Sequence, residues 1–153
     1  MKECTKALEW AKAALTSAPI LAHPAFSETN RFIVTTDASA TGAGAVLSQV
    51  QAGVEQAITY AGVSFNDAQK RYSATDKELV AIRFAVHFKL YLYGRSFVIR
   101  TDHEPLVYLN HMKRVDDRLH RTLEDLAIGH YIIEYVPGKQ NTVVDALSRA
   151  EYP

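Results

Sequence analysis

Four carboxylates of this sequence lie where a carboxylate is difficult to explain by structure alone. Two of them, Asp37 and Asp102, each end a hydrophobic run of residues. Glu78 lies early in a long and mostly apolar helical pattern, and Asp145 lies in the first turn of the last helical pattern. None of the four has an obvious Lys or Arg at pairing distance on its own face. Because ionised carboxylates beside a core are costly without a compensating cation, a cluster of them predicts a divalent metal site with oxygen ligands.

Each carboxylate also has a structural interpretation when it is taken alone. Asp37 could begin a turn, and Asp102 could cap a helix. Glu78 and Asp145 could each stabilise the N-terminal end of the helix in which they lie. The neighbouring Asp76 fits such a role better than a role in a metal site, since it is the acidic residue of a capping pattern at residues 73–76. The chemical interpretation therefore depends on the four carboxylates acting together.

The elements that must position these side chains follow from hydrophobic periodicity and turn residues. The pattern predicts a turn, or a close approach of two backbone segments, at residues 41–44 and a hairpin turn at Gly53. In the helix expected at 74–93, a stripe of apolar side chains is expected to face the core, made of Leu79, Ile82, Val86 and Leu90. The expected strands cover residues 31–38, 45–49, 55–64, 96–101 and 130–136. The expected helices cover residues 5–17, 74–93, 104–112, 116–128 and 142–150.

This order of elements predicts an α/β fold, a mixed five-stranded sheet flanked by helices. The first and fourth strands can lie side by side and parallel, joined by a right-handed crossover. Asp37 and Asp102 would then emerge at adjacent strand ends, where ligand sites of open sheets are common. Glu78 could reach the same edge from the covering helix, and Asp145 from the last helix. Two Mg²⁺ ions about 4 Å apart at such a site can support phosphodiester cleavage.

Composition limits the classes of protein to which the chain can belong. Its 153 residues fit one domain, and 17 basic against 17 acidic residues argue against strong nonspecific binding of nucleic acid through overall charge. The single cysteine, Cys4, excludes an internal disulfide and favours a reducing compartment. No apolar stretch approaches the length of a membrane span, and residues 1–4 contain no signal-peptide hydrophobic region. Because a helical pattern begins almost at once, we expect the chain to continue a longer protein.

Four motifs carry a resemblance to a known family. They are Thr36–Ser39 with Gly42–Leu47, Tyr72–Leu79, Tyr91–Gly94 with Arg100–His103, and Pro137–Asn141 with Val144–Arg149. In this order they resemble the motifs of the RNase H domain of reverse transcriptases, and more narrowly those of gypsy-type LTR retrotransposons. The resemblance covers about residues 32–149, and four ordered motifs make it specific.

The resemblance implies an RNase H-like fold over residues 31–153, preceded at 1–30 by a helix and tether from the polymerase or connection region. It implies a ribonuclease H that hydrolyses the RNA strand of RNA/DNA hybrids during reverse transcription. The implied cofactors are two Mg²⁺ ions, for which Mn²⁺ can substitute. The implied partners are the hybrid and the polymerase domain of the same polyprotein, with no membrane, in cytoplasmic retroelement particles.

The family also implies a role for each of the four carboxylates. Asp37 would bind both ions, Glu78 and Asp102 the ion near the leaving oxygen, and Asp145 the ion that activates water. The products would carry a 3′-hydroxyl and a 5′-phosphate. A noncatalytic RNase H-like connection module and a host-adopted copy are the alternatives, and the four intact carboxylates weigh against the first of these.

Two departures from the family pattern concern catalysis and substrate binding. Many relatives carry a histidine in the loop before the last helix, whereas residues 136–145 contain none, so that Lys139 is a candidate to replace it in part. The connection at 111–115 is too short for the basic hybrid-binding helix of some relatives, so modest substrate affinity is expected. His103 is expected to form a helix-start hydrogen bond rather than to shape the site edge. The candidate contacts with the hybrid are Ser39, Thr41, Gly42, Asn66, Arg71 and Ser73, although a solvated surface charge is the more common interpretation of a residue such as Arg71.

Overall fold

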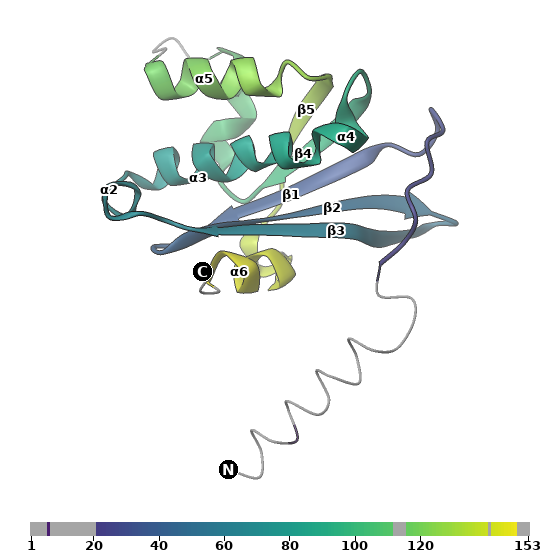
Figure 1. The fold of residues 1–153 in the computed structure, drawn as a ribbon, viewed down its shortest axis with the longest axis horizontal. Helices are drawn as coiled ribbons and strands as arrows, with labels where there is room; N and C mark the ends of the chain where they lie inside the picture. The colour runs from purple at the N-terminus through teal and green to yellow at the C-terminus, as the bar shows by residue number, and fades with distance from the viewer. Residues whose placement is uncertain (1–5, 7–20, 112–115, 141, 150–153) are drawn as a thin grey trace.

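A mixed five-stranded sheet forms the centre of the molecule, as the sequence predicts (Figure 1). The computed structural model describes residues 6, 21–111, 116–140 and 142–149. The strands follow the spatial order β3-β2-β1-β4-β5. The first three form an antiparallel meander, and β1, β4 and β5 run parallel to one another. Their bounds are β1 (Phe32–Ala38), β2 (Gly42–Gln51), β3 (Val54–Ser64), β4 (Ser96–Thr101) and β5 (His130–Tyr135).

The hairpin between β2 and β3 forms where the sequence predicts it. Ala52 and Gly53 are its two loop residues, and their φ angles are 51° and 78°. Two consecutive positive φ angles are typical of the tight turn whose twist matches that of the flanking strands. Gly53 adopts this conformation without steric cost, which fixes the register of the two strands.

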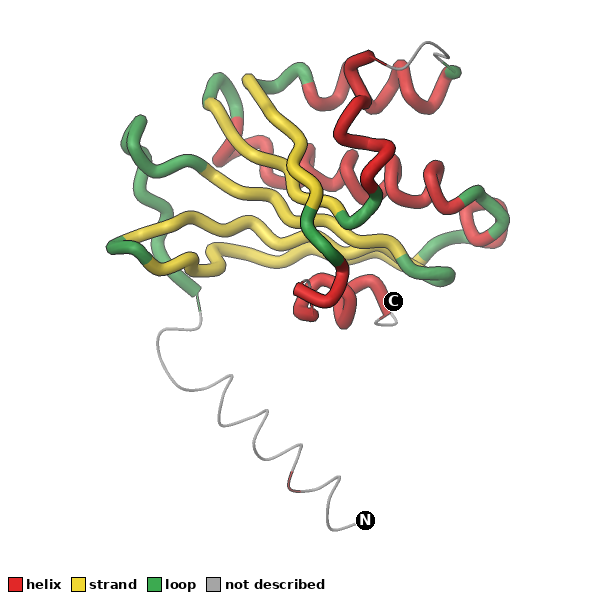
Figure 2. The backbone as a smooth tube through the Cα atoms, turned by 180° about the vertical axis from the view of Figure 1, so that it is seen from behind, coloured by secondary structure: helices red, strands yellow, loops and turns green. Residues whose placement is uncertain are grey.

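Helices cover both faces of the sheet (Figures 1 and 2). Helix α3 packs on one face and contacts α5, whereas α6 packs on the opposite face against β2 and β1. The helical bounds are α2 (Asp67–Lys70), α3 (Ala74–Arg83), η1 (Phe84–Phe88), α4 (Lys89–Leu92), η2 (Glu104–His111), α5 (Asp117–Leu126), η3 (Gly138–Gln140) and α6 (Thr142–Arg149). The helix expected at 5–17 lies outside the described residues, apart from Lys6.

The long helix expected at 74–93 is interrupted by the 3-10 segment η1. Leu79 and Ile82 are buried as predicted, but the prediction for Leu90 is wrong because its side chain is 87% exposed. A 3-10 helix has 3.0 residues per turn instead of the 3.6 of an α-helix. Over five residues, the side chains that follow are therefore rotated about 100° further around the helix axis than in a continuous α-helix. Phe88 and Leu92 enter the core in place of Leu90.

The segment 42–44 is the first part of β2 rather than a turn, but the expected close backbone approach is confirmed. A Cβ atom on Gly42 would lie 2.6 Å from the carbonyl oxygen of Val63 and 2.9 Å from that of Ser148. A Cβ atom on Gly44 would lie 2.7 Å from the Cβ atom of Leu147. Real Cβ atoms do not tolerate such distances, so these glycines let α6 lie directly on the sheet beside the end of β1.

The described part of the tether, residues 21–30, is anchored to the sheet by the buried side chain of Gln49. The N–H of Ala25 donates to Gln49 Oε1 at 2.9 Å. Gln49 Nε2 donates to the carbonyl oxygens of Ala25 at 3.0 Å and Asn30 at 2.9 Å. The N–H of Ala22 donates to the carbonyl oxygen of Ala57 at 2.7 Å. These bonds satisfy a buried amide and fix the direction from which the chain enters β1.

Candidate metal centre at the carboxyl ends of β1 and β4

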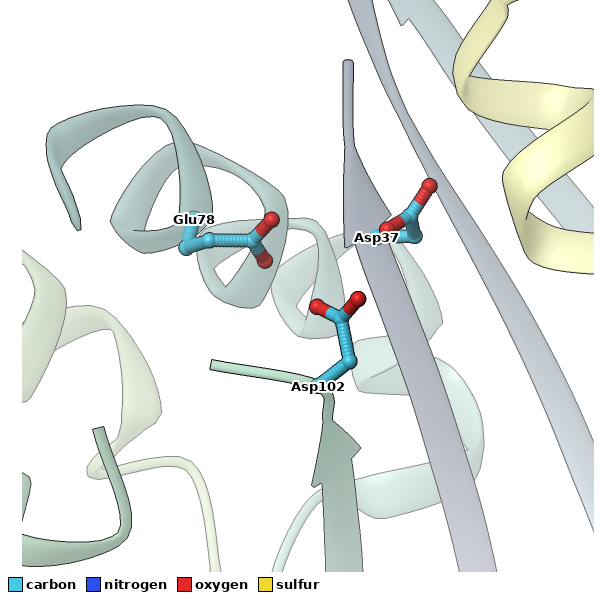
Figure 3. A group of neighbouring side chains, drawn as sticks. All are labelled: Asp37, Glu78 and Asp102. Atoms are coloured by element: carbon cyan, nitrogen blue, oxygen red, sulfur yellow. The ribbon is translucent and has the colours of Figure 1, made fainter. Parts of the chain in front are cut away.

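Three of the four predicted carboxylates converge at one edge of the sheet (Figure 3). One oxygen atom from each of Asp37, Glu78 and Asp102 lies within 4.8 Å of the other two. The parallel register pairs Thr35 with Arg100, so the two aspartates, each two residues further on, emerge side by side. Glu78 reaches the same point from α3, which packs on β1 and β2.

Glu78 is the most strongly perturbed of these carboxylates. Its side chain is 6% exposed, and its Oε1 atom accepts a hydrogen bond from the N–H of Ala38 at 3.1 Å. Its Oε2 atom is buried without a hydrogen-bond partner among the described residues. Burial, followed by repulsion from Asp102 and Asp37, raises the pKa of Glu78 to about 8. The carboxyl group therefore holds a proton at neutral pH unless a cation replaces it.

Asp37 is also buried, and its environment opposes ionisation less strongly. Burial raises its pKa above the ordinary value, and the negative charges of Asp102 and Asp145 act in the same direction. A hydrogen bond from Ser148 Oγ to Asp37 Oδ2, 2.7 Å long, opposes this shift because it stabilises the charged form. An orphaned buried oxygen and two mutually repelling neighbours form a donor set that a cation would complete, so these three residues could hold a metal ion.

Asp145 does not join the three-residue group and forms an ion pair instead. It lies in the first turn of α6, and its side chain is 45% exposed. Its Oδ1 atom lies 2.8 Å from both Nε and Nη2 of Arg149. The expectation that no cation pairs with any of the four carboxylates is therefore wrong for Asp145. The spacing of four residues within one helix is the signal that could have predicted this pair.

Two further residues shape the site and were missed from the sequence. Ser148, fully buried in α6, is the donor to Asp37. Gly138 lies against Asp102, since a Cβ atom on this glycine would lie 2.8 Å from Asp102 Oδ2. For Ser148 the signal was its spacing of three residues from Asp145, which places both on one side of the helix. For Gly138 only the position of the loop could have shown the contact.

Several of the residues predicted to contact the hybrid already have structural partners. Asn66 caps α2 by accepting from the N–H of Gln69 at 2.9 Å, and Ser73 caps α3 by accepting from the N–H of Asp76 at 3.1 Å. Ser39 Oγ donates to the carbonyl oxygen of Ser148 at 2.5 Å. The remaining candidates divide by exposure, with Gly42 buried and both Thr41 and Arg71 exposed. Their contacts with nucleic acid stay predictions.

Asp76 and His103 both form hydrogen bonds at the start of α3. Asp76 serves the start of α3, as predicted, since it accepts from Ser73 Oγ at 2.8 Å. It also pairs with Arg118 of α5 at 2.9 Å. His103 Nε2 shares a 3.0 Å hydrogen bond with Thr75 Oγ1 in the first turn of α3, rather than capping its own helix. This bond joins the segment that carries Asp102 to the helix that carries Glu78.

Comparison with known protein sequences shows the family. The profile described as "RNase H-like domain found in reverse transcriptase" matches residues 27–131. The chain is 40% identical over 148 residues to the Retrovirus-related Pol polyprotein from transposon 412 of Drosophila melanogaster, covering 96% of this chain and 12% of that polyprotein. It is 36% identical to the Transposon Tf2-3 polyprotein of Schizosaccharomyces pombe, covering 95% of this chain and 11% of that polyprotein. The chain thus spans about an eighth of the length of these relatives.

Solved structures show the same fold at low sequence identity. RNase H1 from the archaeon Halobacterium salinarum aligns with a TM-score of 0.60 and 19% identity, over 76% of this chain and 93% of that one. A foamy viral protease-reverse transcriptase in complex with dsDNA aligns with a TM-score of 0.62 and 20% identity, over 89% of this chain and 29% of that one. Among the described residues, no helix is both long and apolar enough to cross a membrane. Together with the sheet order and the carboxylate cluster, these matches show that the chain belongs to the family of RNase H-like domains found in reverse transcriptases, with transposon Pol polyproteins of the gypsy type among its relatives.

Proposed function

We propose that this chain is a ribonuclease H that hydrolyses the RNA strand of RNA/DNA hybrids during reverse transcription. The observation that carries the proposal is the convergence of Asp37, Glu78 and Asp102 at the carboxyl ends of two parallel strands. A protein with the same fold, LC11-RNase H1, has been solved in complex with RNA/DNA hybrid, at a TM-score of 0.58 and 15% identity. The Drosophila relatives are Pol polyproteins, in which such an activity has an evident use.

The proposed cofactor is Mg²⁺, with Mn²⁺ as a substitute. Three carboxylates offer only oxygen atoms, which hard divalent cations prefer. When two such ions are bound, they supply a water of lowered pKa and stabilise charge on the leaving oxygen. Asp37, Glu78 and Asp102 would hold the ions. Asp145 would complete the site once its ion pair with Arg149 is broken and its carboxylate is free to bind metal.

A recess beside the carboxylates suits the backbone of a nucleic acid strand. It has a volume of about 350 Å³, and its lining includes the small side chains of Ala38, Ala40 and Ala74. Lys77 and Arg149 also line it, next to Glu78. Small residues leave room for the sugar, and two cations can contact phosphate oxygens. This geometry supports a strand lying across the end of β1, with its phosphates towards α3 and α6.

The polyprotein context extends the proposal. We infer that residues 31–153 form the RNase H unit and that 1–30 lead from the polymerase or connection region. The polymerase domain of the same polyprotein is then the expected partner, and cytoplasmic retroelement particles are the expected location. A noncatalytic module is the competing function, but it has no need of a buried Glu78 with a raised pKa and one carboxyl oxygen that lacks a hydrogen-bond partner among the described residues, beside two aspartates.

The test is a cleavage assay on a hybrid labelled in its RNA strand, with Mg²⁺ or Mn²⁺. Wild type is compared with Asp37→Asn and with the matched control Asp125→Asn, which alters a surface ion pair between Asp125 of α5 and Arg83 of α3. Cleavage of RNA only in the hybrid, lost in the first variant and kept in the second, would support the proposal. If neither this chain nor the longer polyprotein cleaves the hybrid, the chain is a noncatalytic module.

A further inference from the structure

Ser148 is a fully buried polar residue whose hydroxyl contacts the carboxylate of Asp37 and the backbone of Asp145, two of the predicted metal-binding residues. Its Oγ atom lies 2.7 Å from Asp37 Oδ2 and 2.9 Å from the backbone carbonyl oxygen of Asp145. A hydroxyl carries one proton, and the shorter bond to the carboxylate is the stronger of the two because its acceptor is charged. The hydroxyl of Ser148 therefore donates mainly to Asp37, from a helix that also carries Asp145.

The backbone of Ser148 is held in place from two sides. Ser39 Oγ donates to the carbonyl oxygen of Ser148 at 2.5 Å, and Ser39 Oγ itself accepts from the N–H of Gly42 at 3.1 Å. A Cβ atom on Gly44 would lie 2.9 Å from the Ser148 nitrogen, so the strand backbone directly contacts this turn of α6. A hydroxyl on such a restrained backbone can fix the orientation of its acceptor.

We propose that Ser148 is a positioning residue, which holds the Asp37 carboxylate towards Glu78 and Asp102 and aligns α6, with Asp145, against this group. The inference rests on the proposed function, since it assumes that these carboxylates bind metal. Packing alone does not explain the serine: alanine is the better helix former and would leave no buried hydroxyl to satisfy. The role of the hydroxyl is therefore its bond to Asp37, which orients a ligand before the ion arrives.

The experiment measures Mn²⁺ binding by calorimetry, without nucleic acid, for wild type and Ser148→Ala. Loss of a side chain that orients a metal ligand is expected to weaken the affinity about 10-fold or more. The matched control is Ser48→Ala, because Ser48 is also buried and donates at 2.7 Å to a carboxylate outside the site, Glu55. The control should lose stability without losing Mn²⁺ affinity. Ser148→Thr keeps the hydroxyl and should restore most of the affinity.

Several outcomes separate this inference from the proposed function. If Asp37→Asn binds Mn²⁺ as wild type does, the metal site is wrong and the inference fails with it. If Asp37→Asn loses binding while Ser148→Ala keeps it, only the inference is overturned. An equal loss in the Ser148→Ala and Ser48→Ala variants would indicate general destabilisation and would also overturn it. Should Ser148→Ala not fold, Ser39→Ala tests the same restraint on Ser148, and unchanged Mn²⁺ affinity would refute it.

Discussion

Replacing Glu78 by glutamine should stabilise the metal-free protein at neutral and alkaline pH while it abolishes catalysis. The Glu78 carboxyl is buried, and one of its oxygens has no hydrogen-bond partner among the described residues. A glutamine side chain can keep the bond from the N–H of Ala38 and can turn its NH₂ group towards the carboxylates of Asp37 and Asp102. The substitution thus replaces a mutually repelling group by a neutral donor.

The sign and size of the effect follow from the pKa of Glu78, which rises from 4.5 to about 8 on folding. The folded state binds the extra proton between these two values, so the free energy of unfolding decreases as the pH rises through this window. The stability that protonated Glu78 provides is complete below pH 4.5 and is lost above pH 8. At about 1.4 kcal/mol per pH unit, the loss approaches about 5 kcal/mol as an order of magnitude.

The assay is urea unfolding in a chelator from pH 4.5 to pH 9. Wild type and Glu78→Gln should have similar stability at the acid end, and the variant should become more stable by several kcal/mol at the alkaline end. Glu28→Gln, which neutralises an exposed glutamate, is the control and should follow wild type. Saturating Mg²⁺ should stabilise wild type at pH 8 far more than the variant. Parallel pH curves for wild type and Glu78→Gln in chelator would refute the reasoning.

Three further substitutions have defined expectations. Arg149→Ala removes the partner of Asp145, so the Mn²⁺ ion that Asp145 would help to hold should bind up to about fivefold more tightly at low salt in calorimetry, since an exposed ion pair is worth up to about 1 kcal/mol. Gly138→Ala would place a Cβ atom 2.8 Å from Asp102 Oδ2 and displace this carboxylate, so cleavage of the hybrid should fall about 10-fold to 100-fold with little change in stability to urea. Cleavage at the wild-type rate would show that the contact between residue 138 and Asp102 does not matter for the site. Gln49→Ala removes three hydrogen bonds to residues 21–30 and should lower the free energy of unfolding by about 1–3 kcal/mol. Limited proteolysis should then cut within this segment, whereas unchanged stability would show that Gln49 does not anchor it.

Local patterns in the sequence determined much of this protein. The apolar runs that end at Asp37 and Asp102, on two strands expected to pair in parallel, were enough to place the two aspartates at adjacent strand ends. The phase of α3 likewise placed Glu78 on the side that faces the sheet, because residues 78, 79 and 82 share one face of a regular helix. Both inferences hold because strand and helix geometry repeat regularly over such short distances.

Regularity also explains where the predictions failed. Leu90 was placed in the core on the assumption of a uniform α-helix, whereas the intervening 3-10 segment turned it to solvent. The pair formed by Asp145 and Arg149 follows instead from a regular feature, the four-residue spacing of two opposite charges on one helix. The metal roles of all four carboxylates stay predictions, and Asp145 is the one that lies outside the three-residue group.

Only the tertiary structure decided how the candidate metal ligands are supported. The bond from Ser148 to Asp37 joins residues 111 positions apart, and the contact of Gly138 with Asp102 depends on where one loop crosses the end of β4. Periodicity carries no information about such pairs, because their geometry depends on how α6 and the loop pack against the sheet. The sequence therefore identified the candidate metal ligands, while packing between distant segments decided their orientation and the raised pKa of Glu78.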